Sequence, residues 1–89
     1  MIKKVYEPKS PGALSDFVWG MRKMSEAKKS QKVFDLAIDI MLDPRKVVGL
    51  RYDSEKYRQL RREYGGSAAA CQGLACALLL IEEERDDAR

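Results

Sequence analysis

Basic and aromatic side chains gather near position 60 of this 89-residue sequence, where they are suited to bind a charged ligand. Arg58, Arg61 and Arg62 follow Tyr57 in the stretch YRQLRREY, which Tyr64 ends. Guanidinium groups hydrogen-bond to phosphate oxygens, and tyrosine rings stack on nucleobases. The stretch therefore favours a nucleic acid or nucleotide as ligand. A solvated basic helix face, or a face that docks on an acidic protein surface, has the same composition.

Charge is distributed unevenly along the rest of the chain. Residues up to Arg62 include 15 basic and 8 acidic side chains, whereas residues from Glu63 onward include 2 basic and 6 acidic ones. Lys28 and Lys29 form a second basic cluster that we expect to support the arginines, together with the lysines near the N-terminus. The acidic ending EEERDDAR is an alternative partner for these cations, in its own chain or in a neighbouring copy.

Residues suited to catalysis or metal binding are few. The chain has no histidine, and its two cysteines, Cys71 and Cys76, stand five positions apart. On a helix this spacing turns the thiols about 140° apart, so we expect no intrachain disulfide and interpret both as small buried residues. The acidic row at positions 35, 39 and 43 is interpreted as a solvated helix face. We therefore expect a protein that is not an enzyme and uses neither metal nor cofactor.

Helical periodicity predicts an all-α fold, a small bundle of four to five helices. One apolar stripe indicates a helix from Leu14 to about Lys29. A second stripe begins at Val33 on nearly the opposite side, so the helix is expected to break near residues 28–32, where Ser30 can cap a new one. This second helix should end at the sequence LDPRK, because a proline cannot continue it.

Three further caps divide the second half of the chain. Asp43 before Pro44 predicts a short third helix, and Asp53 predicts a fourth over residues 54–64. The pair Gly65–Gly66 should end that helix, because glycine readily adopts the left-handed conformation found at helix ends. Ser67 can then cap a fifth helix that runs to about residue 84.

The chain is short enough to form one domain. We expect an extended basic N-terminal arm over residues 1–12, a single helical domain over 13–85 and a charged tail over 86–89. Pro8, Pro11 and Gly12 indicate that the arm ends in a turn. Val5 and Tyr6 leave two alternatives open, pairing as a short strand or lying across a neighbouring subunit.

The last predicted helix is apolar on nearly every side between residues 68 and 81. A helix of this kind is surrounded by protein. Ala69, Gly73 and Ala77 form a shallow seam that suits close helix packing, while Leu74 and Leu78 supply bulk beside it. We infer that a second copy covers part of this helix, most simply in a twofold homodimer. The alternative is a central helix enclosed by its own chain.

Trp19 is expected on the first helix opposite the apolar stripe, where its own chain offers no reason for a large aromatic side chain. It is interpreted as an interface residue, either covered by another helix or subunit or exposed as the anchor of an interaction site.

These patterns predict a small helical regulatory protein that binds a nucleic acid or nucleotide through its basic, tyrosine-bearing face. The alternative is an interaction module or inhibitor that docks on another protein through Trp19 and flanking charges. The chain has no apolar run of the kind that forms a signal peptide or spans a membrane, so we expect a cytoplasmic protein without membrane contact.

Overall fold

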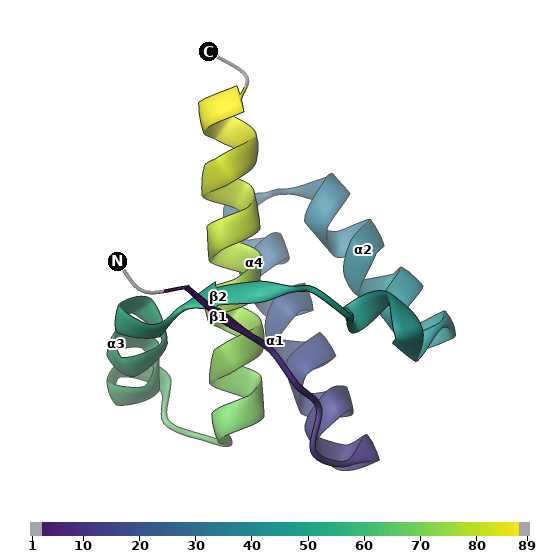
Figure 1. Cartoon of the computed structure of the whole chain (residues 1–89). Coiled ribbons are helices and arrows are strands. Elements are labelled where there is room, and N and C mark those ends of the chain that lie inside the picture. Colours follow the sequence, from purple (N-terminus) through teal and green to yellow (C-terminus); the bar gives the residue numbers. More distant parts are fainter. Residues whose placement is uncertain (1–2, 88–89) are drawn as a thin grey trace.

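The computed structural model describes residues 3–87, which fold into four α-helices, one 3-10 turn and a two-stranded sheet (Figure 1). The helices pack around α4, which stands at the centre of the molecule. In chain order the elements are β1 (Lys3–Val5), α1 (Pro11–Lys28), α2 (Gln31–Leu42), the 3-10 turn η1 (Pro44–Val47), β2 (Arg51–Asp53), α3 (Ser54–Tyr64) and α4 (Ala68–Asp87). The fold is thus mostly helical, as predicted, with a small sheet: a short N-terminal strand was one of two open alternatives, and its partner β2 was not predicted.

Local caps set the helix boundaries where the sequence places them. The Ser30 hydroxyl accepts a hydrogen bond from the amide of Val33, and Asp53 accepts from Glu55 and Lys56 at the start of α3. Asp43 caps η1, and Gly65 and Gly66 end α3 with positive φ angles of 65° and 79°. The predicted boundaries at these four points are confirmed, because each depends on neighbours within a few residues.

The first helix begins earlier than predicted, at Pro11. The Ser10 side chain accepts a hydrogen bond from the Ala13 amide at 3.1 Å, and Pro11 occupies the first helical position, where its missing amide hydrogen is not needed. The proline and glycine at positions 11 and 12 were interpreted as a turn that ends the arm. They instead form the first turn of α1.

The N-terminal segment joins the core. β1 pairs antiparallel with β2, with Lys4 opposite Tyr52, and the pair crosses one face of α4 (Figure 1). Tyr6 is buried and stacks on Phe17 of α1, with ring centroids 3.8 Å apart. Residues 3–6 are therefore a structural part of the domain, whereas residues 1 and 2 of the predicted arm lie outside the described residues.

The central helix is enclosed by its own chain. α1, α3 and the sheet cover α4, while α2 packs mainly against α1, and among the side chains of α4 Cys71, Ala75, Cys76 and Ala77 are almost fully buried (Figure 1). The premise that one chain leaves part of this helix uncovered was wrong. The reason is that α1 packs along the full apolar length of α4, and the sheet covers a further side. This enclosure removes the argument for a second copy on α4.

Two glycines allow α1 to approach α4 closely. A Cβ atom added at Gly73 would overlap the carbonyl oxygen of Phe17, and one added at Gly20 would overlap the carbonyl oxygen of Ala70. The two backbones therefore meet with no side chain between them. The predicted seam of Ala69, Gly73 and Ala77 does accept a helix, and that helix is α1 of the same chain.

The helices that the structure describes do not include one long and apolar enough to cross a membrane. α4 extends to Asp87, three residues past its predicted end, and its last turns are charged. These turns rise above the other elements in Figure 1.

Candidate functional site

A groove of about 500 Å³ lies between α1 and the turn that joins α3 to α4. Asp16, Trp19 and Lys23 form one wall from α1, and Tyr64 forms the other from the last turn of α3. Apolar side chains of α4 form the floor, with Leu74 as the largest. The groove thus joins residues from three helices, and its two aromatic walls come from positions 45 apart in sequence.

The two aromatic side chains of this groove are exposed. Trp19 is 51% exposed and Tyr64 is 66% exposed, although large rings generally bury most of their surface in a protein. Trp19 lies outward because it is on the side of α1 away from the core, as predicted. Its ring is held from one side by the Lys23 ammonium group, which lies 5.8 Å from the ring centroid.

The turn over residues 65–67 places the start of α4 at the edge of the groove. Ser67 caps the helix: its hydroxyl accepts from the amide of Ala70 at 3.1 Å, and its carbonyl accepts from Cys71. Among the described residues, the amides of Ala68 and Ala69 have no such acceptor. Unpaired amides and the helix dipole give this end of α4 a partial positive charge.

Cys71 is a structural residue of the groove floor. Its thiol is buried and donates a hydrogen bond to the carbonyl oxygen of Gly65 at 3.2 Å, which ties the turn to α4. Burial raises the pKa of this thiol, and the positive charge of Arg61 opposes that rise. The group therefore stays neutral near pH 7 and does not offer a thiolate nucleophile.

Arg61 is the predicted arginine whose positive charge affects the pKa of Cys71 in the groove floor. Its guanidinium group donates a hydrogen bond to the Tyr57 hydroxyl at 2.9 Å and lies 6.0 Å from the centroid of that ring. Arg58 and Arg62 are exposed on the outer side of α3. Among the described residues, no carboxylate forms an ion pair with any of the three.

Tyr57 lies beneath the arginines as a support. It is half-buried, and its ring meets that of Tyr52 edge-on, with centroids 5.6 Å apart. Tyr52 is itself buried and accepts a hydrogen bond from Gln72 of α4. Of the tyrosines in this region, Tyr64 is therefore the one with a ring exposed for stacking.

The two predicted lysines lie elsewhere. Lys28 lines a shallow hollow with Lys56 and Glu63, on the flank of α3 turned away from Arg61. Lys29 is the left-handed residue that ends α1, with φ of 58°, and it lines another hollow beside Phe34 of α2. The structure thus brings Arg58, Arg61 and Arg62 together and separates Lys28 and Lys29 from them.

The acidic end of α4 does not neutralise these arginines within the described part of the chain. Glu83 pairs with Lys3 of β1 at 3.3 Å, and Glu83 and Glu84 line a hollow with Lys32 of α2. Figure 1 shows these last turns of α4 beyond the level of α3. The α3 arginines remain available to a ligand.

The remaining predicted interface residues lie inside the chain. Ala69, Gly73, Leu74 and Ala77 are buried, and Leu78 packs against the core. Trp19 is therefore the member of that set with an exposed side chain.

No family model, curated protein or solved structure matches this chain.

Metal ligands do not converge within residues 3–87, where no three acidic or cysteine side chains form a group able to hold an ion. The acidic row of α2 takes part in surface pairs instead. Asp35 accepts from Gln31 at 2.7 Å, Asp39 lies 3.9 Å from the Lys46 ammonium, and Asp43 pairs with Arg45.

Sequence reasoning missed Tyr64 and Lys23 as partners of Trp19. The helical period does place Lys23 one turn after Trp19, which was a usable signal. The approach of Tyr64 to Trp19 depends on how α3 packs against α4, and no local pattern encodes it.

Proposed function

We propose that this protein is a non-enzymatic binder of single-stranded nucleic acid. A base would stack in the groove between Trp19 and Tyr64, and the adjoining phosphates would lie toward Arg61 and the start of α4. The observation that carries the proposal is the exposure of these two aromatic rings, which line the same groove. Aromatic rings reach base faces when the bases are unpaired, which favours a single strand over a duplex.

Positive charge around the groove supports the same ligand. Lys23 lies on the same wall as the carboxylate of Asp16. The positive charge of Arg61 affects the cysteine thiol of the floor, and the first amides of α4 point out of the helix at its positive end. Arg58 and Arg62 continue the positive surface along α3. A nucleic-acid strand that leaves the groove along α3 would meet these guanidinium groups in turn. Each guanidinium group can donate two parallel hydrogen bonds to the oxygens of one phosphate.

The groove chemistry supports binding rather than catalysis. Its one thiol is buried, neutral and engaged with Gly65, so it is poorly suited to attack a substrate. The Trp19 and Tyr64 rings supply stacking surface, which is tolerant of base identity. We therefore expect little sequence preference.

The aromatic pair is tested by fluorescence polarisation with a labelled single-stranded oligonucleotide of about 12 nucleotides, a length within the range that small single-strand binders cover. Trp19→Ala and Tyr64→Ala should each weaken binding roughly 5- to 150-fold, which corresponds to about 1–3 kcal/mol per stacked base. Val5→Ala is the matched control, because Val5 is as exposed as Trp19, at 51%, but lies on β1 outside the groove. Equal binding by Trp19→Ala and the unchanged protein would contradict the proposal.

A second candidate function uses the same groove to hold a segment of another protein. The observation in its favour is the apolar floor, formed by Ala70, Cys71 and Leu74 beside the Trp19 ring. Trp, Tyr and Arg are also the residues that dominate binding energy in protein interfaces. Absence of oligonucleotide binding even at low salt would leave this candidate as the better account of the groove.

A further inference from the structure

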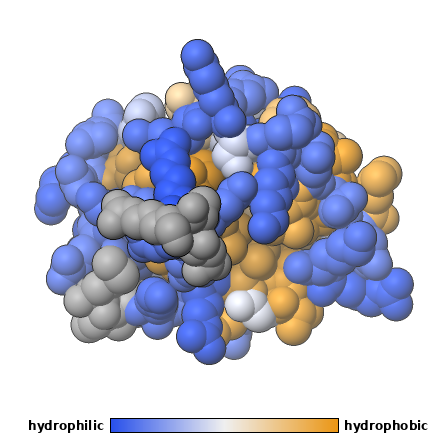
Figure 2. Space-filling view, turned by 90° about the horizontal axis from the view of Figure 1, so that it is seen from above, coloured by the Kyte–Doolittle hydropathy of each residue, from blue (hydrophilic) through white to orange (hydrophobic). Residues whose placement is uncertain are grey.

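Exposed apolar side chains lie at the end of α2 and directly after η1, on the far side of α4 from α3 (Figure 1). Leu42 and Val48 are each 80% exposed, and Met41 is 56% exposed. Figure 2 shows apolar surface on the side of the molecule where α2 lies. We call these three residues the α2 corner. Such a concentration of exposed apolar surface on a small domain indicates a contact that the single chain does not make.

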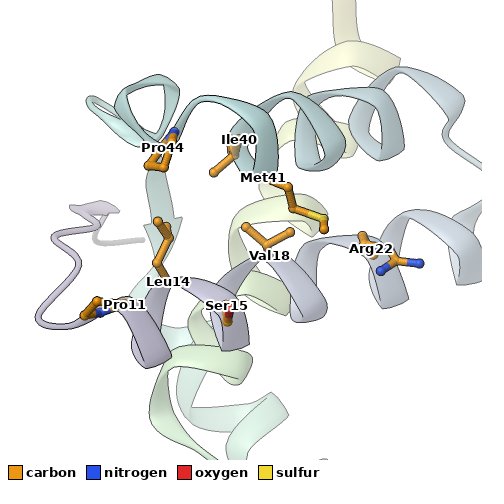
Figure 3. A pocket seen from close by; sticks show the side chains of 8 residues that line it. All are labelled: Pro11, Leu14, Ser15, Val18, Arg22, Ile40, Met41 and Pro44. Atoms are coloured by element: carbon orange, nitrogen blue, oxygen red, sulfur yellow. The ribbon is translucent and has the colours of Figure 1, made fainter.

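A groove of about 320 Å³ lies directly beside this corner, between the first half of α1 and the last turns of α2. Leu14 and Val18 point into it from α1, and Ile40 and Met41 point into it from α2 (Figure 3). Pro11 and Pro44 line it at the end where α1 begins. A projecting apolar corner and an apolar groove thus lie next to each other on one surface.

The charges around the corner balance one another. Asp43 accepts two hydrogen bonds from the Arg45 guanidinium, at 3.0 and 3.2 Å, and Asp39 lies 3.9 Å from the Lys46 ammonium. These two acidic and two basic groups balance, and Arg22, which lines the groove, adds one positive charge. A strongly basic partner would be repelled here, whereas a partner with exposed carboxylates would complement Arg22.

Arg22 lies at the α1 side of the groove and favours an occupant with an acceptor group. Its guanidinium lies 5.7 Å from the Phe34 ring centroid, and its Nε atom is buried without a hydrogen-bond partner among the described residues. In the part of the chain that the structure describes, no carboxylate pairs with this guanidinium, so an occupant of the groove that brings a carboxylate to this end would be favoured. The carboxylates along α2 of a second copy have this chemistry.

We infer that the α2 corner and its groove form a twofold self-association surface, in which the occupant is a second copy of this chain. In a twofold contact each surface meets its own counterpart, so Leu42 of each copy would enter the groove of the other. This surface shares no residue with the Trp19–Tyr64 groove, and the inference does not depend on nucleic-acid binding. A dimer would carry two Trp19–Tyr64 grooves, one on each copy, and could bind one nucleic-acid strand at both of them.

The size of the surface sets the expected strength of self-association. A standard interface buries about 800 Å² on each partner, roughly a seventh of the 5756 Å² that this chain exposes. Three side chains and one groove lie at the small end of that range. We therefore expect a reversible dimer with a dissociation constant roughly in the micromolar range.

Sedimentation velocity tests this inference on the whole chain without nucleic acid, from about 1 μM to about 500 μM, a range that brackets micromolar association. The weight-average mass should rise from that of one chain, 10.1 kDa, toward twice that value. Leu42→Lys should raise the dissociation constant at least roughly 10-fold, because each dimer buries two copies of the residue. Val5→Lys is the matched control, since Val5 is exposed on β1 away from the corner.

Three results would overturn the inference. The first is a mass that stays at one chain across the whole range. The second is a dimer that Leu42→Lys leaves intact, with circular dichroism showing that the variant is folded. The third is association that weakens steeply as salt rises, which would indicate contact between the acidic end of α4 and the basic face of α3 rather than an apolar surface. None of these results bears on oligonucleotide binding by a single chain.

Discussion

Cys76 illustrates how a single side chain responds to the core of this protein. It is fully buried in α4, and burial raises the pKa of its thiol to about 12, with a further contribution from the negative charge of Glu83. A thiolate at this position would lack both water and a cationic partner. The folded state therefore holds the neutral thiol, whereas the unfolded chain releases the proton at the ordinary pKa.

This difference predicts a loss of stability at alkaline pH. Because the folded pKa is the higher one, the contribution of Cys76 is complete below its ordinary value of 9.0 and is lost as the pH rises toward about 12. The free energy of unfolding should fall in this window by up to about 4 kcal/mol, at about 1.4 kcal/mol for each unit between the two pKa values. Urea denaturation at a series of pH values measures the fall.

Cys76→Ala provides the control for that series. It should be less stable at neutral pH because it leaves a small cavity, but its decline above pH 9.0 should be shallower. Tyr6 is also buried, and burial raises its pKa, so part of the alkaline decline should persist in the variant. Identical declines in both proteins would show that Cys76 does not contribute.

At the scale of elements, the crossing of α1 over α4 is the contact that organises the bundle. Gly20 and Gly73 stand on facing sides of it, and each meets a backbone carbonyl group of the other helix. Glycine lowers helix propensity, so its presence in two helix interiors is unfavourable locally and is offset by close packing of the two backbones. The crossing buries Phe17 and Met21 completely.

Gly73→Ala should separate these helices and destabilise the fold by about 1–3 kcal/mol, as overpacking commonly does. A backbone carbonyl at the collision point cannot rotate away as a side chain does, so relief requires the whole helix to shift. Gly12→Ala is the matched control, because a Cβ there meets only the Ser10 hydroxyl at 4.0 Å. Thermal denaturation compares the two variants, and equal melting temperatures would contradict this account of the crossing.

The sequence predicted best those element boundaries that depend on residues close together in the chain. The caps at Ser30, Asp43 and Asp53 involve neighbours two or three residues away, and all three were predicted. A short strand at Val5 and Tyr6 was one of two open alternatives, and β2 was missed, because each strand has three residues, too few for a visible alternation, and because Lys4 and Tyr52 are far apart in the chain. Composition showed that α4 must be covered but did not show that α1 of the same chain covers it.

The candidate site was predictable only in part for the same reason. The position of Trp19 opposite the apolar stripe and the clustering of the α3 arginines follow from helical spacing and were anticipated, whereas exposure of Trp19 was one of two alternatives left open. The pairing of Trp19 with Tyr64 depends on the angle at which α3 meets α4 after the two glycines of the turn. Tyr57 was expected to face a ligand, yet it lies under Arg61 because Tyr52 of the unpredicted strand β2 packs beside it.

At the scale of the whole molecule, charge and apolar surface are separated. Arg58, Arg61 and Arg62 lie on α3, and Glu83 in the last turns of α4 pairs with Lys3. The α2 corner is apolar, and the charges at its edge, such as Asp43 and Arg45, are paired with each other. A nucleic acid would therefore bind one side of the molecule, and a second copy of the chain would bind another. We expect nucleic-acid binding to weaken as salt rises, through counterion release, and self-association to be little affected by salt.

The salt dependence gives a prediction for the arginines as a group. The logarithm of the association constant for a single strand should fall with the logarithm of salt concentration, with a slope near −0.7 for each phosphate neutralised. Arg61→Gln should reduce the magnitude of that slope by about 0.7. Lys46→Gln serves as the control, because Lys46 lies near Asp39 on the other side of the molecule, and its slope should match that of the unchanged protein.

The central claim is that a base stacks on Trp19, and the intrinsic fluorescence of this residue tests it most directly. The chain has a single tryptophan, so its emission reports on the groove alone. Titration with an unlabelled single-stranded oligonucleotide at low salt should quench this emission, with a midpoint equal to that of the polarisation curve. An unchanged emission spectrum while polarisation reports full binding would place the strand elsewhere on the protein and contradict the account.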